Sequence, residues 1–213
     1  MTKLVGFIFG PNGSGKGTLA DKLTEKGYIH IGGGNLIRQW AQKHNRTDII
    51  DKISQGNFID NDLLSSILEE KLSEVSSSHK LLFEGIPRKK SQITIVKNLL
   101  HDYGYKPAWI IVLHAPLEVL IERVSNRVFG PDGKVYHMTL NPPPAHFKMS
   151  QLKMRPDDRS EIAKKRYEYY ITHTLECVSD EFFLDTPVKT IDATQSIDKV
   201  YSESIEFISQ IVG

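Results

Sequence analysis

The chain has 213 residues, enough to bury the core of one domain, and its 27 basic residues nearly balance its 26 acidic residues. The formal net charge of +1 gives no overall field that would attract nucleic acid or an anionic membrane. No apolar run is long enough to cross a bilayer, and the single cysteine, Cys177, excludes an intramolecular disulfide. We therefore expect a soluble, cytoplasmic, monomeric protein that folds as one unit and binds neither nucleic acid nor membrane.

A glycine-rich loop, Gly10 to Thr18, follows the apolar run Leu4 to Phe9 and leads into a helical pattern. Its sequence is Gly-Pro-Asn-Gly-Ser-Gly-Lys-Gly-Thr. Glycines allow successive backbone N–H groups to face one anion, a helix N-terminus adds partial positive charge, and Lys16 can reach the outer phosphates. The pattern is typical of a phosphate-binding P-loop. Gly17 follows the lysine where the strict pattern has Ser or Thr, which indicates a subclass of this loop.

Apolar strand patterns alternate with helical patterns along the rest of the chain. The expected strands lie at 4–9, 28–31, 81–83, 109–113 and 190–192. The expected helices lie at 16–26, throughout 35–75, at 91–102, 117–126 and 157–176, and from 197 to about 212. Buried strands that alternate with helices predict an α/β fold with a parallel sheet.

Polar residues are expected at several helix N-termini. Asn35, Asp48 and Asn61 are the predicted caps within 35–75, and Ser196 is the predicted cap of the last helix. The acidic pair Asp157-Asp158 is expected to begin the helix 157–176, because negative charge suits a helix N-terminus.

Residues 128–154 differ from the rest of the chain, because glycines and prolines, including Pro142-Pro143-Pro144, replace the helical periodicity. We interpret this stretch as an inserted irregular lobe. Long segments of this kind inside a compact domain are usually functional or mobile. A lobe that closes over a site would exclude water from the reaction.

Arginine is scarce, with eight among the 27 basic residues, so its placement is informative. Six arginines lie at expected element boundaries or beside the inserted lobe: Arg38, Arg88, Arg123, Arg127, Arg155 and Arg166. Guanidinium groups bind phosphate through two parallel hydrogen bonds and stay charged, although any one arginine alone is equally consistent with a surface ion pair. Together with a P-loop, the set favours phosphoryl transfer between two nucleotides, in which the acceptor is already an ionised phosphate and needs no general base.

Five blocks of sequence, in order, resemble the adenylate kinase family, and they cover nearly the whole chain. They are the P-loop, the segment His30 to Arg38, the segment Glu84-Gly85-Ile86-Pro87-Arg88 with Gln92, the segment from Glu122 through Val135-Tyr136-His137 to Pro143, and Arg155-Pro156-Asp157-Asp158 with Lys165-Arg166. The resemblance implies a five-stranded parallel sheet flanked by helices, in a single P-loop kinase domain that spans 1–213. It also implies a nucleoside monophosphate-binding lobe at 33–75 and a lid insertion at 128–154.

By this resemblance the protein would transfer a phosphoryl group reversibly from ATP to AMP, with Mg²⁺ as cofactor, and form two ADP. The implied ATP-binding residues are Gly13, Ser14, Gly15, Lys16, Gly17, Thr18, Arg123, Arg127 and Tyr136. The implied AMP-binding residues are Gly33, Arg38, Gly85, Arg88, Gln92, Arg155 and Arg166. The implied catalytic residues are Lys16, Arg88, Arg127, Arg155, Asp157 and Arg166, and Glu84 would hold the Mg²⁺ through water.

Several residues depart from the family's pattern. Gly33 stands where a threonine usually touches the acceptor base, which would leave room in the pocket. Glu84 replaces an aspartate and is one methylene longer, and Asn35 replaces an aspartate but keeps the ability to cap a helix. The lid is shorter than the long form, lacks an Asp-x-x-Thr-Gly-Glu stretch and contains no cysteine, so it holds no zinc of the four-cysteine type.

Two other functions are consistent with the same residues. A kinase for UMP, CMP or dCMP is favoured by Gly33 and disfavoured by Gln92. A catalytically weak adenylate-binding sensor is suggested by Glu84, by the triple glycine 32–34 and by the altered lid, whereas Lys16 and the arginines disfavour it. The sequence leaves the donor open between ATP and GTP.

Overall fold

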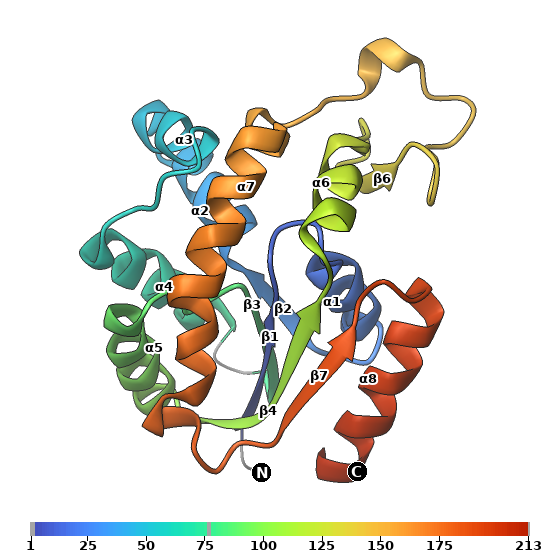
Figure 1. Cartoon of the computed structure of the whole chain (residues 1–213). Helices are drawn as coiled ribbons and strands as arrows, with labels where there is room; N and C mark the ends of the chain where they lie inside the picture. Colours follow the sequence, from blue (N-terminus) through green and yellow to red (C-terminus); the bar gives the residue numbers. More distant parts are fainter. Residues whose placement is uncertain (1–2, 76–77, 213) are drawn as a thin grey trace.

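The computed structural model of the protein describes residues 3–75 and 78–212. In these residues, five parallel strands form one sheet in the order β2-β3-β1-β4-β7 (Figure 1). The strands are β1 (Lys3–Phe9), β2 (Ile29–Gly32), β3 (Lys80–Glu84), β4 (Tyr105–His114) and β7 (Val188–Asp192). The predicted α/β fold with a five-stranded parallel sheet is confirmed, with strands that extend one to four residues beyond some of the expected ends.

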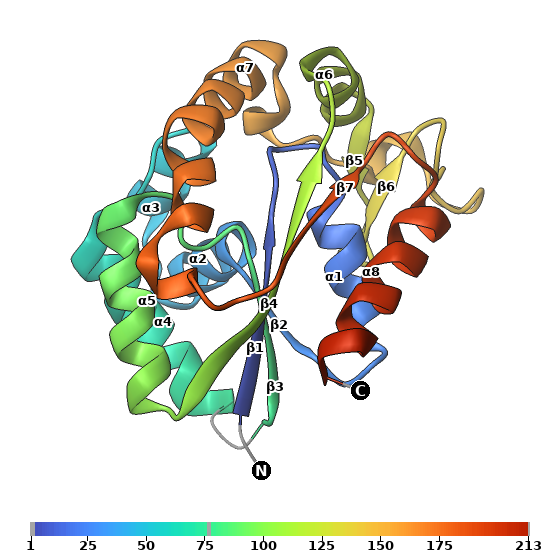
Figure 2. The same cartoon turned by 60° about the horizontal axis from the view of Figure 1, so that its bottom comes forward.

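Helices cover both faces of the sheet. Those that the described residues form are α1 (Lys16–Thr24), α2 (Gly33–Lys43), α3 (Thr47–Ser54), α4 (Asn61–Val75), α5 (Lys90–Asp102), α6 (Leu117–Ser125), α7 (Ser160–Tyr169) and α8 (Ile197–Val212). Figure 2 shows α1 and α8 on one side of the sheet and α2 to α5 with α7 on the other. None of the described helices is both long and apolar enough to span a bilayer.

Strand β1 shows how one apolar sequence supplies both cores. Val5, Phe7 and Phe9 pack on the side of α4 and α5, whereas Ile8 packs on the side of α1 and α8. Successive side chains of a strand point to opposite faces, so a strand covered on both faces needs an almost continuous apolar run. The two hydrophobic clusters fix β1 at the centre of the sheet, between β3 and β4.

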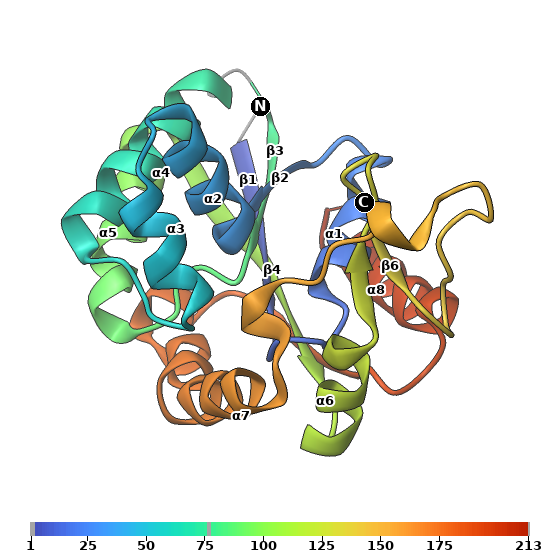
Figure 3. The same cartoon turned by 90° about the horizontal axis from the view of Figure 1, so that it is seen from above.

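The carboxyl ends of β1 and β3 lie side by side, because Ile8 is in register with Glu84. The P-loop therefore leaves the sheet beside the segment that follows Glu84. In open parallel sheets, ligands bind in the crevice outside the carboxyl ends of the strands. Figure 3, which looks down on this edge, shows α2 and α3 on one side of it and the segment around β6 (Val135–His137) on the other.

The inserted lobe contains a small antiparallel sheet. Strand β5 (Arg127–Phe129) pairs with β6, Phe129 also bridges to Lys153, and a short 3-10 turn, η1, covers Met149–Gln151. The segment is thus irregular but held at both ends by backbone pairing.

Three of the four predicted helix caps are wrong. Helix α2 begins at Gly33, so Asn35 lies inside it, and α3 begins at Thr47, so Asp48 lies inside α3 and pairs with Arg46. At α4 the cap is Asp60, whose carboxylate accepts a hydrogen bond from the Leu63 N–H at 2.9 Å, and Asn61 is the first helical residue. Ser196 does cap α8, accepting from the Lys199 N–H at 3.3 Å.

The expected helix 157–176 is also different in the structure. Asp157 and Asp158 form a separate 3-10 turn, η2 (Pro156–Asp158), and α7 begins only at Ser160. Beyond Tyr169 the chain continues as a π-helical turn, η3 (Tyr170–Thr174), and two 3-10 turns, η4 (Leu175–Ser179) and η5 (Glu181–Phe183). The two aspartates do not charge a helix N-terminus, because both are buried and paired with arginines from other elements.

Candidate functional site

The P-loop of residues 10–18 joins β1 to α1 with glycines where the backbone requires them. Gly13 and Gly15 have φ values of 85° and 88°, in the left-handed region that other residues rarely adopt. A Cβ at Gly13 would also lie 2.8 Å from the Leu120 carbonyl oxygen. Within the described residues, the hydroxyl of the buried Ser14 has no hydrogen-bond partner and no side chain caps the first turn of α1. Unpaired donors at a helix N-terminus are groups that can bind an anion.

Lys16 lies between this loop and the end of β3. Its ammonium donates to the Pro11 carbonyl at 2.8 Å and lies 3.7 Å from Glu84 Oε1. Burial lowers the pKa of Lys16 to about 8, with Glu84 opposing the shift. Gly17 and Thr18, the next two residues of α1, are exposed to solvent.

Glu84 is largely covered but remains ionised. Burial alone would raise its pKa, but His30, Lys16 and Arg88 outweigh that effect and hold the pKa at about 2. Glu84 Oε2 lies 3.8 Å from His30 Nε2 on the neighbouring strand. The negative charge at the end of β3 is therefore fixed beside the lysine of the P-loop.

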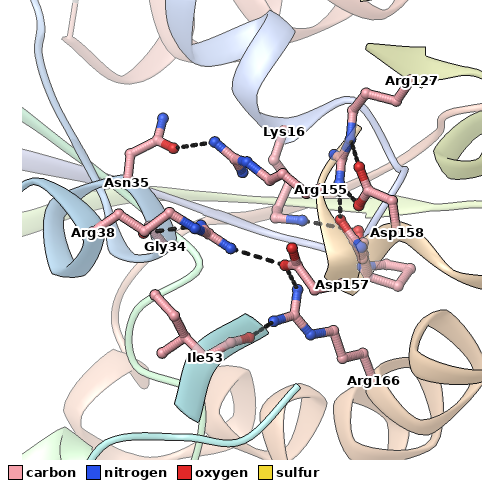
Figure 4. Close-up of polar contacts among 12 residues, drawn as sticks. Lys16, Gly34, Asn35, Arg38, Ile53, Arg127, Arg155, Asp157, Asp158 and Arg166 are labelled. Atoms are coloured by element: carbon pink, nitrogen blue, oxygen red, sulfur yellow. Dashed lines mark hydrogen bonds and ion pairs between the residues drawn. The ribbon is translucent and has the colours of Figure 1, made fainter. Parts of the chain in front are cut away.

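Asp157 joins arginines from two separate elements (Figure 4). Its Oδ2 accepts from Arg38 of α2 at 2.9 Å and from Arg166 of α7 at 2.6 Å, and Arg166 also donates to the Ile53 carbonyl at 3.0 Å. Burial opposes the charge of Asp157, but Arg166, Arg38 and Arg155 hold its pKa below the usual range. Asp157 Oδ1 and Arg166 Nε are buried and have no hydrogen-bond partner in the part of the chain that the structure describes, so the network has unused hydrogen-bonding capacity.

Arg127, at the entry to the inserted lobe, is held by two residues that our sequence analysis did not select. Both of its hydrogen bonds to carboxylate oxygens go to Asp158, and its Nη2 also donates to Asn12 Oδ1 at 3.2 Å. Asp158 was predicted only as a helix-terminal charge. Asn12 gave no distinguishing signal, because an asparagine in a glycine-rich loop is equally typical of a turn.

Arg155, at the exit of the inserted lobe, contacts both that lobe and α2. Its guanidinium stacks over the Phe129 ring at 3.9 Å from the centroid, and Nη2 donates to Asn35 Oδ1 at 2.9 Å. Asn35 is thus a partner for an arginine and not a helix cap. Burial and the neighbouring Arg38 lower the pKa of Arg155 to about 10, so the group stays charged at neutral pH.

A pocket between α2 and the end of β3, which we call the α2–β3 pocket, contains most of the residues assigned to the acceptor. It is lined by Gly33, Gly34, Ile37, Arg38, Ile53, Asn57, Phe58, Ile59, Leu64, Gly85, Ile86, Arg88, Gln92 and Arg166. Arg88 donates from Nε to the Gly85 carbonyl at 2.9 Å, and the buried Gln92 accepts from the Arg88 backbone N–H at 2.8 Å through Oε1. The arginine side of this pocket can bind an anion, and its apolar side can bind a flat ring.

The room that Gly33 was expected to leave in this pocket is not open. A Cβ at residue 33 would lie 2.7 Å from Ile86 Cγ1 and 3.0 Å from Ile86 Cδ1. The Ile86 side chain therefore fills the space that a threonine would need. The expectation of a roomier pocket was wrong, because it considered residue 33 without the residue facing it.

Arg123 and Tyr136 form their hydrogen bonds away from Asp157 and Asp158. Arg123, in the last turn of α6, donates to the Ala193 carbonyl at 2.7 Å, just after β7. Tyr136, on β6, donates to Asp132 Oδ2 at 2.6 Å within the inserted lobe. These contacts assign Arg123 to the α6 and β7 side of the P-loop and Tyr136 to the lobe above it.

The comparisons with known proteins agree with this arrangement. A sequence model described as adenylate kinase matches residues 8–185. The chain belongs to the adenylate kinase family. An adenylate kinase of Chloroherpeton thalassium is 32% identical over 211 residues, covering 95% of this chain and 96% of that protein. Another member of the family, from Pyrococcus abyssi, is 33% identical over 204 residues, 91% of this chain and 90% of that protein. The adenylate kinase of Pyrococcus horikoshii is 35% identical over 174 residues, 77% of each chain.

Proposed function

We propose that this protein has adenylate kinase activity, the reversible transfer of the terminal phosphoryl group of ATP to AMP to form two ADP. One observation carries the proposal, the convergence of cationic side chains between the P-loop and the α2–β3 pocket. These side chains are Lys16, Arg38, Arg88, Arg127, Arg155 and Arg166. Membership of the adenylate kinase family supports the same activity.

The P-loop and the α2–β3 pocket would bind the two nucleotides on opposite sides of the transferred group. Residues 13–18 offer backbone N–H groups and Lys16 to the phosphates of ATP, with Arg123 and Tyr136 on the donor side. Arg38 and Arg88 would bind the phosphate of AMP, and Gln92 would contact its base with the amide end that Arg88 leaves free.

The chemistry needs charge and alignment more than proton transfer. The acceptor is already an ionised phosphate, so the side chains must neutralise the oxygens of the transferred group and keep the two nucleotides in line. Asp157 and Asp158 prepare the arginines for this task, because they hold Arg38, Arg166 and Arg127 in place before any nucleotide binds. Closure of residues 128–154 over the site would exclude water.

Glu84 fits the requirements of a magnesium site. It is a partly exposed carboxylate that stays ionised beside the P-loop lysine, and Mg²⁺ in nucleotide sites is typically bound by one or two carboxylates, waters and substrate phosphates. Glu84 would hold the ion through water. When bound, Mg²⁺ would neutralise part of the charge on the phosphates.

The same proposal includes a cytoplasmic, monomeric enzyme whose mobile parts are residues 33–75 and 128–154. Nearly balanced charge supports a protein that acts on small nucleotides and not on a polyanion surface.

The first test is an assay of ADP release with Mg-ATP as donor and AMP, UMP, CMP or GMP as acceptor, repeated with Mg-GTP as donor. Turnover with ATP and AMP at least about tenfold above the other pairs is the expected result. Preference for a pyrimidine acceptor would contradict the proposal. Nucleotide binding by calorimetry without turnover would favour the sensor instead.

The alternative function, a kinase for UMP, CMP or dCMP, is no longer favoured by Gly33. It depended on open space at Gly33, and Ile86 occupies that space. The buried Gln92 remains as a hydrogen-bonding group for a purine edge.

A further inference from the structure

Gly32 is a glycine at a position where the backbone does not require one. Its φ of −90° and ψ of 114° are ordinary extended values that any residue adopts. An alanine at such a position normally stabilises a protein, because it restricts the unfolded chain. The reason for glycine here must therefore lie in the space around the missing side chain.

That space is bordered by the side chains of His30 and Glu84. Gly32 is in register with Glu84 on the neighbouring parallel strand. A Cβ at residue 32 would lie 2.8 Å from His30 Nε2, closer than real Cβ contacts allow, and 3.0 Å from Glu84 Oε2, so the carboxylate would have to shift by a few tenths of an ångström. Neither neighbour is at the surface, since the Glu84 and His30 side chains are only 17% and 15% exposed.

Glu84 cannot give way without losing its other contacts. Its Oε1 lies 3.7 Å from Lys16 Nζ and its Oε2 lies 3.8 Å from His30 Nε2, so the carboxylate lies between the lysine and the histidine. Glutamate is one methylene, about 1.5 Å, longer than aspartate. The longer side chain needs space beside it, and the absence of a Cβ at Gly32 provides that space.

We infer that Gly32 is a positioning residue for Glu84: its missing side chain leaves the space in which the longer carboxylate reaches both Lys16 and the proposed magnesium waters. Residues 32 and 84 then form a size-matched pair, glycine with glutamate, and each tolerates change only when the other changes. The magnesium part of this inference rests on the proposed function, whereas the size match does not.

A double-mutant cycle on the full chain tests the pair. Gly32→Ala is expected to lower Tm by about 2–10 °C, because overpacking of a filled site outweighs the gain from a restricted unfolded chain. It should also lower kcat about tenfold or more, because it displaces Glu84. Adding Glu84→Asp, which shortens the side chain, should recover most of the Tm loss. The kcat of the double variant should be at least about threefold higher than the value expected if the effects of the two substitutions were additive.

Two control variants separate size from charge and from general damage. Glu84→Gln keeps the length of the side chain and should not rescue Gly32→Ala. Gly34→Ala is the matched glycine control, because its Cβ would meet only the Arg38 guanidinium, at 3.2 Å, and neither Glu84 nor His30, so its effect should not depend on residue 84. Rescue by His30→Asn but not by Glu84→Asp would assign the clash to histidine and overturn the inference.

A magnesium titration gives the readout that a purely structural role would not change. Gly32→Ala should raise the Mg²⁺ concentration for half-maximal turnover at least about threefold, and Glu84→Asp should reverse this rise. Binding of magnesium-free ADP, measured by calorimetry, should stay within about twofold of wild type in both variants.

Additive effects of the two substitutions on Tm and turnover would overturn the pairing. A wild-type protein without turnover, but with coupling in Tm, would reject the proposed function and keep the size match. Coupling in Tm without any change in the magnesium titration would reject the positioning role.

Discussion

Gly33 and Ile86 share one space in the α2–β3 pocket, as Gly32 and Glu84 do one residue earlier. Gly33→Thr would add a side chain where Ile86 already lies. The added side chain must displace Ile86, so the KM for AMP should rise about tenfold. The double variant with Ile86→Ala should recover most of that loss. KM for AMP and for UMP would be measured in the wild type, in Gly33→Thr and in the double variant. Improved selectivity for AMP in Gly33→Thr alone would contradict this prediction.

Lys16 is the cation nearest the proposed donor phosphates. Lys16→Ala should lower kcat by at least about a hundredfold, because the charge it removes acts on the group being transferred. Lys22→Ala is the matched control, since Lys22 lies on the same helix in an exposed ion pair with Asp198. For both variants, the turnover rate with ADP as the single substrate would be measured, together with the far-UV circular dichroism spectrum. Near-normal turnover in Lys16→Ala would remove the P-loop from the proposed site.

Cys177 gives the stability of the protein a pH dependence of known sign. Burial, with Asp180 and Glu176 nearby, raises the pKa of its thiol from about 9 to about 12. Between these values the folded state keeps a proton that the unfolded state releases, so the free energy of unfolding should fall as pH rises from 9 to 12. Cys177→Ala should show a shallower fall. Urea unfolding at pH 8 to 11 measures both slopes, and equal slopes would contradict the assignment.

Among the elements, the inserted lobe contains a small aromatic contact. In the described residues no group of three or more His, Cys, Asp or Glu side chains could hold a metal ion. Phe147 packs edge-on against Tyr136, with ring centroids 6.1 Å apart, and both are half-buried. The lobe is therefore held by its short sheet, by this pair and by Arg155 on Phe129.

Phe147→Ala should loosen this lobe while leaving the main sheet intact. The KM for ATP should rise about threefold to tenfold, because Tyr136 loses its support, and Tm should change by less than about 3 °C. Met149→Ala, in the same lobe with 69% of its surface exposed, is the control and should behave as wild type. A large loss of Tm in Phe147→Ala, or an equal effect in both variants, would show that the contact is not local to the lobe.

The turn η2 shows why the element after the lobe was predicted incorrectly. An acidic pair before a helical pattern is typical of a helix N-terminus, and the sequence around Asp157 contains nothing against that interpretation. In the structure Asp157 pairs with Arg38, 119 residues away in the sequence, and Asp158 pairs with Arg127. Both carboxylates are buried, and a buried carboxylate requires a charged partner, which these arginines supply.

The whole molecule gathers more positive than negative charge at one edge of the sheet. Six cations, Lys16 and five arginines, face three carboxylates there, Glu84, Asp157 and Asp158, which leaves a surplus of three positive charges. Nucleotide phosphates would neutralise this surplus and connect elements from opposite ends of the chain. Binding should therefore stabilise the fold as a whole.

ADP at about a hundred times its Kd should raise Tm by about 5–10 °C, from about 2.7 kcal/mol of binding linkage. Adenosine, which lacks phosphates, is the control and should raise Tm much less. Added KCl should reduce the ADP shift, because the attraction is electrostatic. Differential scanning fluorimetry with the two ligands provides the test, and equal shifts would show that the base and not the phosphate dominates binding.

Local sequence was enough to predict the strands, the P-loop and most helices, because each depends on patterns within a few residues. An almost continuous apolar run specifies a strand buried on both faces, and glycines at 13 and 15 specify a loop that turns its amides toward an anion. The resemblance then indicated which residues could belong to one site. It could not show which of them contact one another.

Those contacts were decided by the tertiary structure. Asp157 and Asp158 pair with arginines, Ile86 fills the space beside Gly33, and Gly32 leaves room for Glu84. Each relation joins residues that only the packing of separate strands and helices brings together, so no local pattern encodes it. The sequence determined the family, the fold and the set of charged groups, and the folded chain determined their partners, because packing and charge pairing act between distant segments.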